Sequence, residues 1–513
     1  MSDLVQRVPG SRRVYAWASV ACITISLAVM LAVSAAGPSI VVPGMAHTTG
    51  TPPWWGSLNP GRWILFAMWG TAVVAAIGVG AGLVAVARGA RPPVRALLAA
   101  SFIAVAAFAV LPPAGSTDAQ SYAIDGSMVV MGHTPYTDTP AQIARQGDPF
   151  AVNSPPSWQN AKSDYGPLAT AEEWVWAELG GWSMAQVTFW LQLWVELAFV
   201  AVTLLLDRVL RSNPSMRLRA HLLWSVNPLV LWEIVAAGHI DAFAVVFGLA
   251  GLLLVRFREP ETRPSLWRVA GAGALIGLAG DVKVPMLVFG LGAAWAVRRS
   301  VASLAALAAG AAAVLVPSYT VFGSSAVRVL FDRSSQVTWD NLYQVFYRPL
   351  GMSKFGQDNV PAHLQTIALV AFLAVAVLAF IRVPDRVPGL PAVTPSLALA
   401  AAWLFLFPFQ RPWYDVMLIA LLALYPRSWL DWVVLVRLCF GAITYMESAT
   451  LDHHLLIQEV QLFQGEWITS SVRLLAVIAL IWMCVTRRWG FDPVEPVDNS
   501  RPLVHNSVDT AWG

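Results

Sequence analysis

Apolar stretches of about 20 residues recur along almost the whole chain, with short polar connections between them. An α-helix of this length crosses the hydrocarbon core of a bilayer, because each residue advances the helix by about 1.5 Å. The pattern predicts an all-α polytopic integral membrane protein with about 12–14 transmembrane helices. The predicted crossings are 14–37, 63–87, 94–112, 185–206, 220–236, 241–255, 267–280, 284–297, 301–321, 363–381, 396–409, 413–426, 429–446 and 467–486.

Two pairs of these predicted helices are too short to cross the bilayer twice. Segments 267–297 and 396–426 are each about 30 residues long, whereas two full crossings need roughly 40 residues. We expect each pair to form a hairpin whose apex stops short of the outer surface and leaves a depression there. Irregular backbone at this depth is tolerated where it lines a protein-walled cavity.

Composition supports a membrane protein and excludes an ordinary soluble domain. The chain is 57% hydrophobic and 12% charged, whereas soluble domains carry about 25% charged residues. Its three cysteines lie in or beside apolar segments, at spacings typical of neither a metal site nor a disulfide. The sequence has no glycine-rich phosphate loop or Rossmann fingerprint. We expect no nucleic-acid partner.

Basic residues are distributed unevenly between alternate connections. One set of connections, together with the termini, holds 22 of the 33 Lys and Arg residues, although the other set includes the three longest loops. Such an excess marks the cytoplasmic side. We therefore expect a multi-pass plasma-membrane protein with both termini in the cytoplasm. Residues 1–13 form its N-terminal tail, 14–489 a single membrane domain, and 490–513 a polar tail expected to be disordered.

Ionisable and aromatic residues gather at the outer ends of the predicted helices. A charge at the centre of a helix costs about 2.5–3.5 kcal/mol on insertion scales, so such residues indicate function or pairing. For any single cluster, helix capping or interfacial anchoring explains the pattern equally well, but clusters on one face favour an extracytoplasmic active site. The clusters are Asp118 with Tyr122, His239 with Asp241, Asp281 with Lys283, Arg411 with Trp413, Tyr414 and Asp415, and Asp452 with His453 and His454.

The first outer loop, 113–184, contains the first of these clusters. Polar residues alternate with apolar ones at helical spacing from Asp118 to Ser127, which predicts an amphipathic helix lying in the membrane interface. Residues 147–169 are rich in Pro, Asn, Asp and Gly, which predicts irregular backbone. Long ordered loops are usually functional, although a plain extracytoplasmic linker is the alternative. Further outer loops are predicted at 322–362 and 447–466.

Several short motifs follow one another in a characteristic order. They are Asp118-x-x-Ser121-Tyr122-x-x-x-Gly126, Gly132-His133-Thr134-Pro135-Tyr136, Gly147-Asp148-Pro149-Phe150, Tyr165-Gly166-Pro167-Leu168, Asn227-Pro228-Leu229, Gly238-His239-x-Asp241, Lys283 with Pro285, and Gln410-x-Pro412-Trp413-Tyr414. This order resembles the polyprenol-phosphate-mannose-dependent α-1,6-mannosyltransferases of actinobacterial lipomannan and lipoarabinomannan synthesis. The resemblance covers about residues 110–430, and Ile240 and Arg411 depart from the family pattern.

The resemblance implies a GT-C-type fold with an extracytoplasmic active site. It also implies a polyprenyl-phosphate-mannose donor and a growing mannosylated glycolipid of the cell envelope as acceptor. A GT-C enzyme of other specificity, such as an α-1,2-mannosyltransferase or an arabinofuranosyltransferase, is an alternative. A transporter or flippase for a lipid-linked sugar is another, for which paired broken helices or inverted repeats would be expected.

Sugar transfer from a lipid phosphate to a hydroxyl needs a base, a phosphate site and contacts to the sugar. Asp118 is the expected general base. One carboxylate without a covalent intermediate inverts the anomeric configuration, whereas retention needs a second close acid. The alternative for Asp118 is a helix N-cap. The expected phosphate ligands are Lys283, His239 and Arg411, and the expected sugar or acceptor ligands are Tyr122, Asp241, Tyr165, Trp413 and Tyr414.

A divalent metal is the remaining question of chemistry. Asp118, His239, Asp241 and His453 are residue types that bind Mn²⁺ or Mg²⁺. Their spacing is not that of a tight ligand set, and cationic side chains can take the place of a metal beside a phosphate. We therefore expect no cofactor, with a divalent metal as the alternative.

Overall fold

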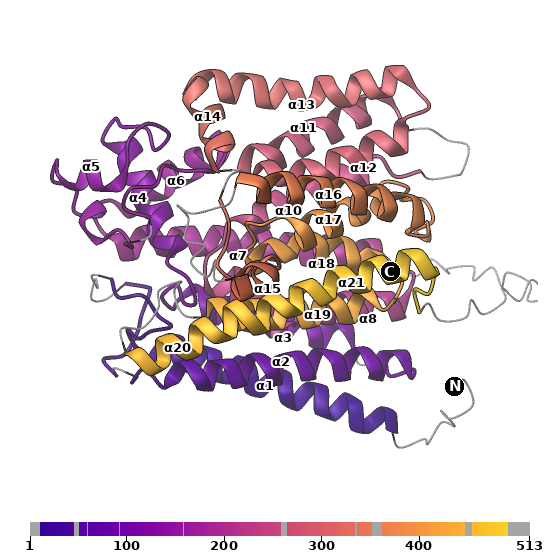
Figure 1. Cartoon of the computed structure of the whole chain (residues 1–513), viewed down its shortest axis with the longest axis horizontal. Helices are drawn as coiled ribbons and strands as arrows, with labels where there is room; N and C mark the ends of the chain where they lie inside the picture. The colour runs from indigo at the N-terminus through magenta and orange to yellow at the C-terminus, as the bar shows by residue number, and fades with distance from the viewer. Residues whose placement is uncertain are drawn as a thin grey trace, which may run out of the picture.

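A computed structural model describes most of the chain. Its described residues are 11–45, 51–58, 60–91, 93–156, 158–257, 264–333, 336–350, 362–446 and 454–490. Most of both predicted tails, and Asp452 and His453, lie outside these residues. Every regular element in the described part is helical (Figure 1). The prediction of an all-α polytopic membrane protein is therefore confirmed.

Six helical runs in the described part are long and apolar enough to cross a membrane on their own. Five of them coincide with predicted crossings, whereas the sixth extends the predicted crossing 467–486 back to Leu455, so part of the predicted outer loop 447–466 is helix of the same run. They are α1 (Ser11–Ala36), α2 (Ile64–Ala87), α7 (Met184–Val209), α13 (Val301–Phe322), α16 (Ala362–Arg382), and the continuous run of α20 (Leu455–Phe463), η6 (Gln464–Thr469) and α21 (Ser470–Thr486).

The other predicted crossings fall on shorter helices, so the count of 12 to 14 crossings stays a prediction. Each of these helices is too short to cross the bilayer core alone. They are α3 (Val94–Ala109), α8 (Pro214–Leu223), α9 (Pro228–Val230), η2 (Leu231–Ala236), α10 (Asp241–Leu254), α11 (Leu266–Val282), η3 (Val284–Leu287), α12 (Val288–Val297), α17 (Val393–Leu406), η5 (Pro412–Tyr414), α18 (Asp415–Leu424) and α19 (Leu430–Tyr445).

Both predicted hairpins are pairs of helices joined near the expected apex. The first turns at Lys283, whose extended backbone separates α11 from η3 and α12. The second turns at residues 407–411, where the chain leaves α17 before η5 begins. Lys283 and Arg411 therefore lie in short non-helical connections, where the backbone can present them to a cavity, whereas Asp281 lies near the end of α11 and Asp415 begins α18.

A third break lies between η2 and α10, whose axes are bent by 111° relative to each other. The first limb begins at Pro228, and the side chain of Asn227 accepts a hydrogen bond from the Leu229 N–H as its cap. The break contains Gly238 in a left-handed conformation with φ of 69°, which a residue without Cβ adopts at little cost. His239 lies within this break, and Asp241 is the first residue of α10 after it.

The first outer loop forms its own helical layer at one end of the bundle (left in Figure 1). The predicted helix after Asp118 is confirmed as α4, but ten of its thirteen residues are buried. It packs against α6 and α7 rather than lying exposed in the membrane interface. The helices of the outer loops are α4 (Asp118–Val130), α5 (Pro140–Ala144), η1 (Ala151–Asn153), α6 (Pro167–Gly180), α14 (Ser324–Arg333), α15 (Gln344–Tyr347) and η4 (Arg348–Leu350).

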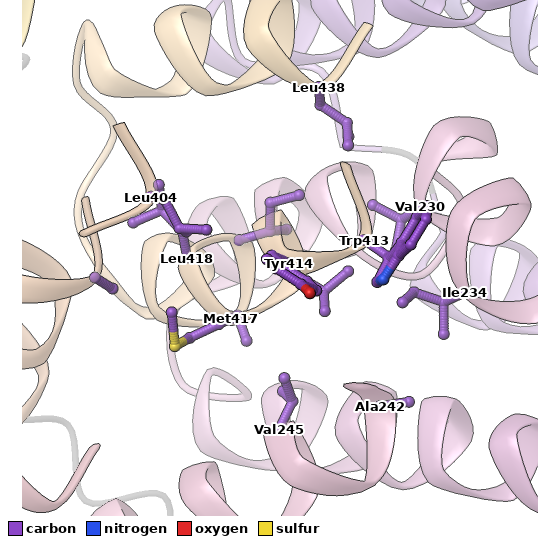
Figure 2. Packing of buried hydrophobic residues seen from close by; sticks show 14 of the residues in the cluster. Val230, Ile234, Ala242, Val245, Leu404, Trp413, Tyr414, Met417, Leu418 and Leu438 are labelled. Atoms are coloured by element: carbon purple, nitrogen blue, oxygen red, sulfur yellow. The ribbon is translucent and has the colours of Figure 1, made fainter. Parts of the chain in front are cut away.

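An apolar core lies directly against the breaks and apices. Figure 2 shows Trp413, after the second apex, beside Val230 and Ile234 of the broken span, and Tyr414 toward Leu418 of the helix that follows. Side chains in such interiors are closely packed, so their positions are fixed to within small shifts. The apolar core therefore holds the polar residues of the two segments in one place.

Candidate active site

Residues of four of the five predicted clusters lie at or beside one pocket under the first outer loop. The pocket has a volume of about 50 Å³. Six of the nine predicted site residues line it, and the other three lie behind its wall. The lining residues are Asp118, Ser121, Tyr122, Asp125, Pro140, Ser154, Trp158, Ala161, Lys162, Ser163, Asp164, Tyr165, Phe409, Arg411, Trp413 and Tyr414.

Asp118 is the first residue of α4 and is largely buried. Its backbone N–H donates to Ser116 Oγ at 3.1 Å, and Thr117 occupies the N-cap position. The alternative in which Asp118 is the helix N-cap is therefore wrong. Its carboxylate instead reaches the pocket, and Oδ2 lies 3.6 Å from Nε2 of His239.

His239 supports Asp118 from behind. Its Nδ1 donates to the carbonyl oxygen of Glu233, which can only accept, and its Nε2 lies 3.1 Å from Ser116 Oγ. The ring stacks on Trp413, with centroids 3.8 Å apart and planes inclined by 16°. Because Nδ1 faces the Glu233 carbonyl, Nε2 is the ring nitrogen that faces Ser116 Oγ and the Asp118 carboxylate. His239 does not itself line the pocket, and its contact with a phosphate stays a prediction.

Neighbouring positive groups keep Asp118 ionised. Burial by itself would raise the pKa of this carboxyl group. The hydrogen bond and charge of His239 and the positive charges of Arg411 and Lys283 together outweigh burial, so the pKa lies below its ordinary value. Asp118 is therefore a carboxylate at neutral pH and can accept a proton.

Lys283 and Asp241 form a buried ion pair. The Nζ atom lies 2.9 Å from Oδ1 and 3.0 Å from Oδ2 of the carboxylate. It also lies 3.8 Å from the ring centroid of Tyr414 and 5.3 Å from that of Tyr165. The structure thus brings the predicted phosphate ligand and the predicted sugar ligand together, and each neutralises the other. Neither lines the pocket.

Arg411 is a buried cation on the pocket wall with aromatic neighbours. Its Cζ lies 4.7 Å from the ring centroid of Tyr445 and 5.1 Å from that of Phe409. Trp158 and Trp413 lie within 6 Å on other sides. No carboxylate of the described residues lies within 4 Å of it. Rings stabilise a guanidinium but do not cancel its charge, so Arg411 is available to an anion.

Two tyrosines, one from α4 and one from the loop before α6, meet at the pocket wall. The hydroxyl groups of Tyr122 and Tyr165 lie 3.0 Å apart, and their rings meet edge to face. The loop that carries Tyr165 is held by the Gly166 N–H, which donates to the Val282 carbonyl at 3.1 Å. A Cβ at Gly166 would overlap the Asp281 carbonyl oxygen. The glycine of this motif therefore allows the loop to touch the hairpin apex.

Two buried arginines that sequence reasoning missed hold the floor of the site. Arg437 of α19 donates to Asp415 and, at 2.7 Å, to Gln410 Oε1, so Asp415 faces away from the pocket. Arg473 of α21 lies 2.6 Å from Asp340 Oδ2. Both arginines fall inside predicted crossings, where a charge requires a partner. An arginine inside a predicted crossing could therefore have been recognised from the sequence as a member of a buried ion pair.

The remaining predicted residues do not meet at the pocket. His454 precedes α20 and is exposed. Among the residues that the structure describes, no three His, Cys, Asp or Glu side chains form a group that could hold a metal ion. Of the four residues considered as metal ligands, Asp118, His239 and Asp241 are described, and Lys283 rather than another ligand faces Asp241.

The sequence matches a known protein family. Residues 20–299 match the MptA_B family, described as alpha-(1->6)-mannopyranosyltransferase, N-terminal domain. The match includes Asp118, His239 and Lys283, whereas Arg411 lies beyond it. No curated protein matches the chain significantly. The match spans more than half of the chain, as the motif order predicted, and this protein is therefore a membrane glycosyltransferase that belongs to the alpha-(1->6)-mannopyranosyltransferase family.

Proposed function

We propose that the protein transfers mannose from polyprenyl-phosphate-mannose to a growing mannoside acceptor on the extracytoplasmic side of the membrane. The bond formed is α-1,6, and the reaction inverts the anomeric configuration. The observation that carries the proposal is that Asp118 and Arg411 line one pocket. Family membership supports mannosyl transfer, and the distribution of Lys and Arg supports the outer side.

The proposed reaction needs one proton acceptor and one site for negative charge. An acceptor hydroxyl attacks the anomeric carbon of mannose, and its proton passes to the Asp118 carboxylate. The bond from this carbon to the phosphate oxygen breaks, and polyprenyl phosphate leaves. The donor phosphate is a diester with one negative charge, whereas the leaving monoester gains another. Because the attack inverts the anomeric configuration, a β-linked donor yields an α-mannoside.

Arg411 is the group best placed to stabilise the leaving phosphate. Its planar guanidinium can donate two parallel hydrogen bonds to phosphate oxygens. A fixed cation in a site that excludes water stabilises developing charge by several kcal/mol. The positive charge of Lys283 is already balanced by the Asp241 carboxylate, so it can stabilise a phosphate less than Arg411 can. We therefore propose that Arg411 binds the donor phosphate. The Lys283–Asp241 ion pair instead holds the hairpin apex against α10.

His239 then acts as a positioning residue for the base. Its contact with Asp118 and its stacking on Trp413 fix the carboxylate relative to the pocket. Binding of the donor also changes the base, because the phosphate anion offsets the positive charges that lower the pKa of Asp118. That pKa rises when the phosphate sits beside Arg411, and the carboxylate becomes a stronger base when the donor is present.

The sugar is expected among the aromatic side chains of the pocket. A volume of about 50 Å³ has room for a few water molecules rather than a hexose, since one water needs about 10–15 Å³ by this measure. Entry of mannose therefore requires the loop with Tyr165 to move away from Tyr122. Trp413 and Tyr414 remain as the fixed apolar surface, because both belong to the packed core (Figure 2).

Purified protein with radiolabelled polyprenyl-phosphate-mannose and short α-mannosides tests the proposal. We expect a mannoside longer by one residue, sensitive to an α-1,6-specific mannosidase. Label that crosses the membrane of a proteoliposome without joining an acceptor would instead indicate a transporter. A product of α-1,2 linkage, or transfer from an arabinofuranosyl donor alone, would replace the proposed specificity with one of its alternatives.

A further inference from the structure

We propose that the end of the bundle opposite the candidate active site binds the phosphate group of an anionic membrane lipid. The binding site is a cavity lined by four arginines, Arg256, Arg298, Arg299 and Arg386, which we call the arginine pocket. Two helices separate it from the active site. α10 runs from Asp241 toward Arg256, and α12 runs from the Lys283 apex toward Arg298.

The arginine pocket is a hollow into which four exposed arginines converge. Its volume is about 920 Å³. Its lining comes from three stretches that are distant in sequence: Arg256, Phe257 and Pro264 after α10, the residues between α12 and α13, and those after α16. The Phe257 N–H donates to the Gly389 carbonyl at 3.0 Å and ties the first stretch to the third. An excess of basic residues on one side orients a membrane protein but does not require that they converge on one cavity.

Three of the four arginines, Arg256, Arg298 and Arg299, have no carboxylate partner within 4 Å in the described part of the chain. The acidic residue among the lining, Asp385, accepts a hydrogen bond from Thr394 Oγ1 at 3.0 Å. Arg298 is held in place, since it donates to the Trp295 carbonyl at 2.7 Å and stacks on the ring of that residue. Several guanidinium groups around one cavity favour a phosphate.

Exposed tryptophans place the arginine pocket at the depth of lipid headgroups. Trp267, at the start of α11, is 89% exposed, and Trp429, before α19, is 53% exposed. Trp295, on the pocket wall, is also exposed. Tryptophan is enriched at the membrane–water interface, where its ring has an apolar body and a polar edge. A lipid phosphate lies at the same level, so the ligand need not leave the bilayer.

The rim of the arginine pocket provides a path for acyl chains. Val301 begins α13 directly after Arg299 and Ser300, and it is 84% exposed. Ile381, near the end of α16, is 68% exposed. Both helices present apolar side chains to the surroundings along most of their length. A lipid with its phosphate in the cavity can therefore lay its chains along these helices, which a soluble phosphate cannot do.

The test uses the full-length protein in detergent and follows its thermal stability during titration. The probes are phosphatidylglycerol, phosphatidylcholine and inorganic phosphate. We expect saturable stabilisation by phosphatidylglycerol, little by phosphatidylcholine, and no competition from inorganic phosphate at millimolar concentration. Competition by inorganic phosphate equal to that of the lipid would show a soluble anion site and overturn the lipid assignment.

Arg256→Gln/Arg299→Gln should weaken the apparent affinity for phosphatidylglycerol by about 10-fold or more. The matched control is Arg208→Gln/Arg211→Gln, which removes the same charge from exposed positions near the end of α7 and should change the affinity less than about 2-fold. Equal loss in both pairs would show unspecific surface attraction and overturn the proposal. Arg299→Lys keeps the charge and the fold but loses the bidentate geometry, so unchanged affinity there would also contradict a phosphate pocket.

Discussion

The Nζ atom of Lys283 lies 2.9 Å from Oδ1 of Asp241, and both side chains are buried. Each therefore has its charge balanced by the other before any donor binds. Of the three cations expected to bind phosphate, Arg411 is the one that combines a place on the pocket wall with the lack of a carboxylate partner in the described part of the chain. The following predictions separate these roles.

Arg411→Ala should reduce mannosyl transfer by about 10²–10³-fold, the typical effect of losing a group that stabilises developing charge. Lys283→Ala should instead lower the stability of the protein, because it leaves the Asp241 carboxylate buried without a partner, at a cost of about 3–5 kcal/mol. The matched control is the double variant Lys283→Met/Asp241→Asn, which removes both charges and should restore stability. Thermal unfolding and initial rates measure the two effects. Full activity of a folded Arg411→Ala protein would exclude Arg411 as the phosphate ligand.

Asp118→Asn should lower transfer by about 10²-fold or more, since asparagine cannot accept the hydroxyl proton. Shape and hydrogen-bonding capacity are nearly preserved, so folding and donor binding should remain. Asp164→Asn is a suitable control, because Asp164 lines the same pocket without the contact to His239. Rates should be measured at saturating donor. A wild-type rate for Asp118→Asn would require another base.

The acidic limb of the pH profile should report the environment of Asp118. Its pKa lies below the ordinary value, so activity should hold as pH falls from neutral and decline only when this carboxylate becomes protonated. His239→Gln removes a group that lowers this pKa, and the limb should therefore move to higher pH. The measurement is kcat/KM against pH for both proteins. If the variant loses activity with an unchanged limb, His239 acts on something other than the charge of Asp118.

The side of the membrane can be tested with single cysteines. Cysteines replacing Gln146 and Asn160, both exposed in the first outer loop, should react with an impermeant maleimide added to intact cells. One replacing Ser212, exposed after α7, should react only after the membrane is opened. Cys22, the native cysteine that is not fully buried, is replaced in the background. The reverse labelling pattern would place the pocket in the cytoplasm.

Gly166→Ala should destabilise the loop around the pocket. The added Cβ overlaps the Asp281 carbonyl oxygen, which is backbone and cannot turn away. Overpacking of this kind typically costs about 1–3 kcal/mol. Proteolysis of the folded protein should then cut between residues 147 and 165 faster than in wild type. Gly147→Ala is the control, because no atom lies within 4 Å of a Cβ built there, although its positive φ adds some strain. Equal protection in wild type and Gly166→Ala would show that this contact does not hold the loop.

Much of the site could be predicted from the sequence because its residues stand at helix ends. Asp118, Tyr122 and Arg411 lie at one end of the bundle, as polar residues at the limits of apolar segments indicate. Which of them pair could not be predicted. The rotation of α10 about its axis decides whether Asp241 faces Lys283 or the pocket. This rotation depends on packing against other helices and cannot be predicted from the local sequence pattern.

The burial of α4 was missed for a related reason. The same alternation of polar and apolar residues is expected for a helix at a membrane surface and for a helix whose polar side faces the interior of the protein. Ser127 illustrates the second case, since its hydroxyl donates to Asp148 Oδ2 at 2.9 Å inside the protein. The partner is 21 residues away in a segment of irregular backbone, where periodicity gives no register.

The 111° bend between η2 and α10 also has a consequence for biosynthesis. α10 has 14 residues and the limb before it is shorter still, whereas a segment needs about 20 apolar residues to be stable across the bilayer core alone. Neither limb can therefore leave the translocon as an independent unit. Because α10 packs mainly against α7 and α11, and α11 is synthesised after it, we expect the broken span to become stable in the bilayer only once α11 has emerged. The bend that brings His239 to Asp118 thus makes membrane insertion of this region a cooperative step among neighbouring helices.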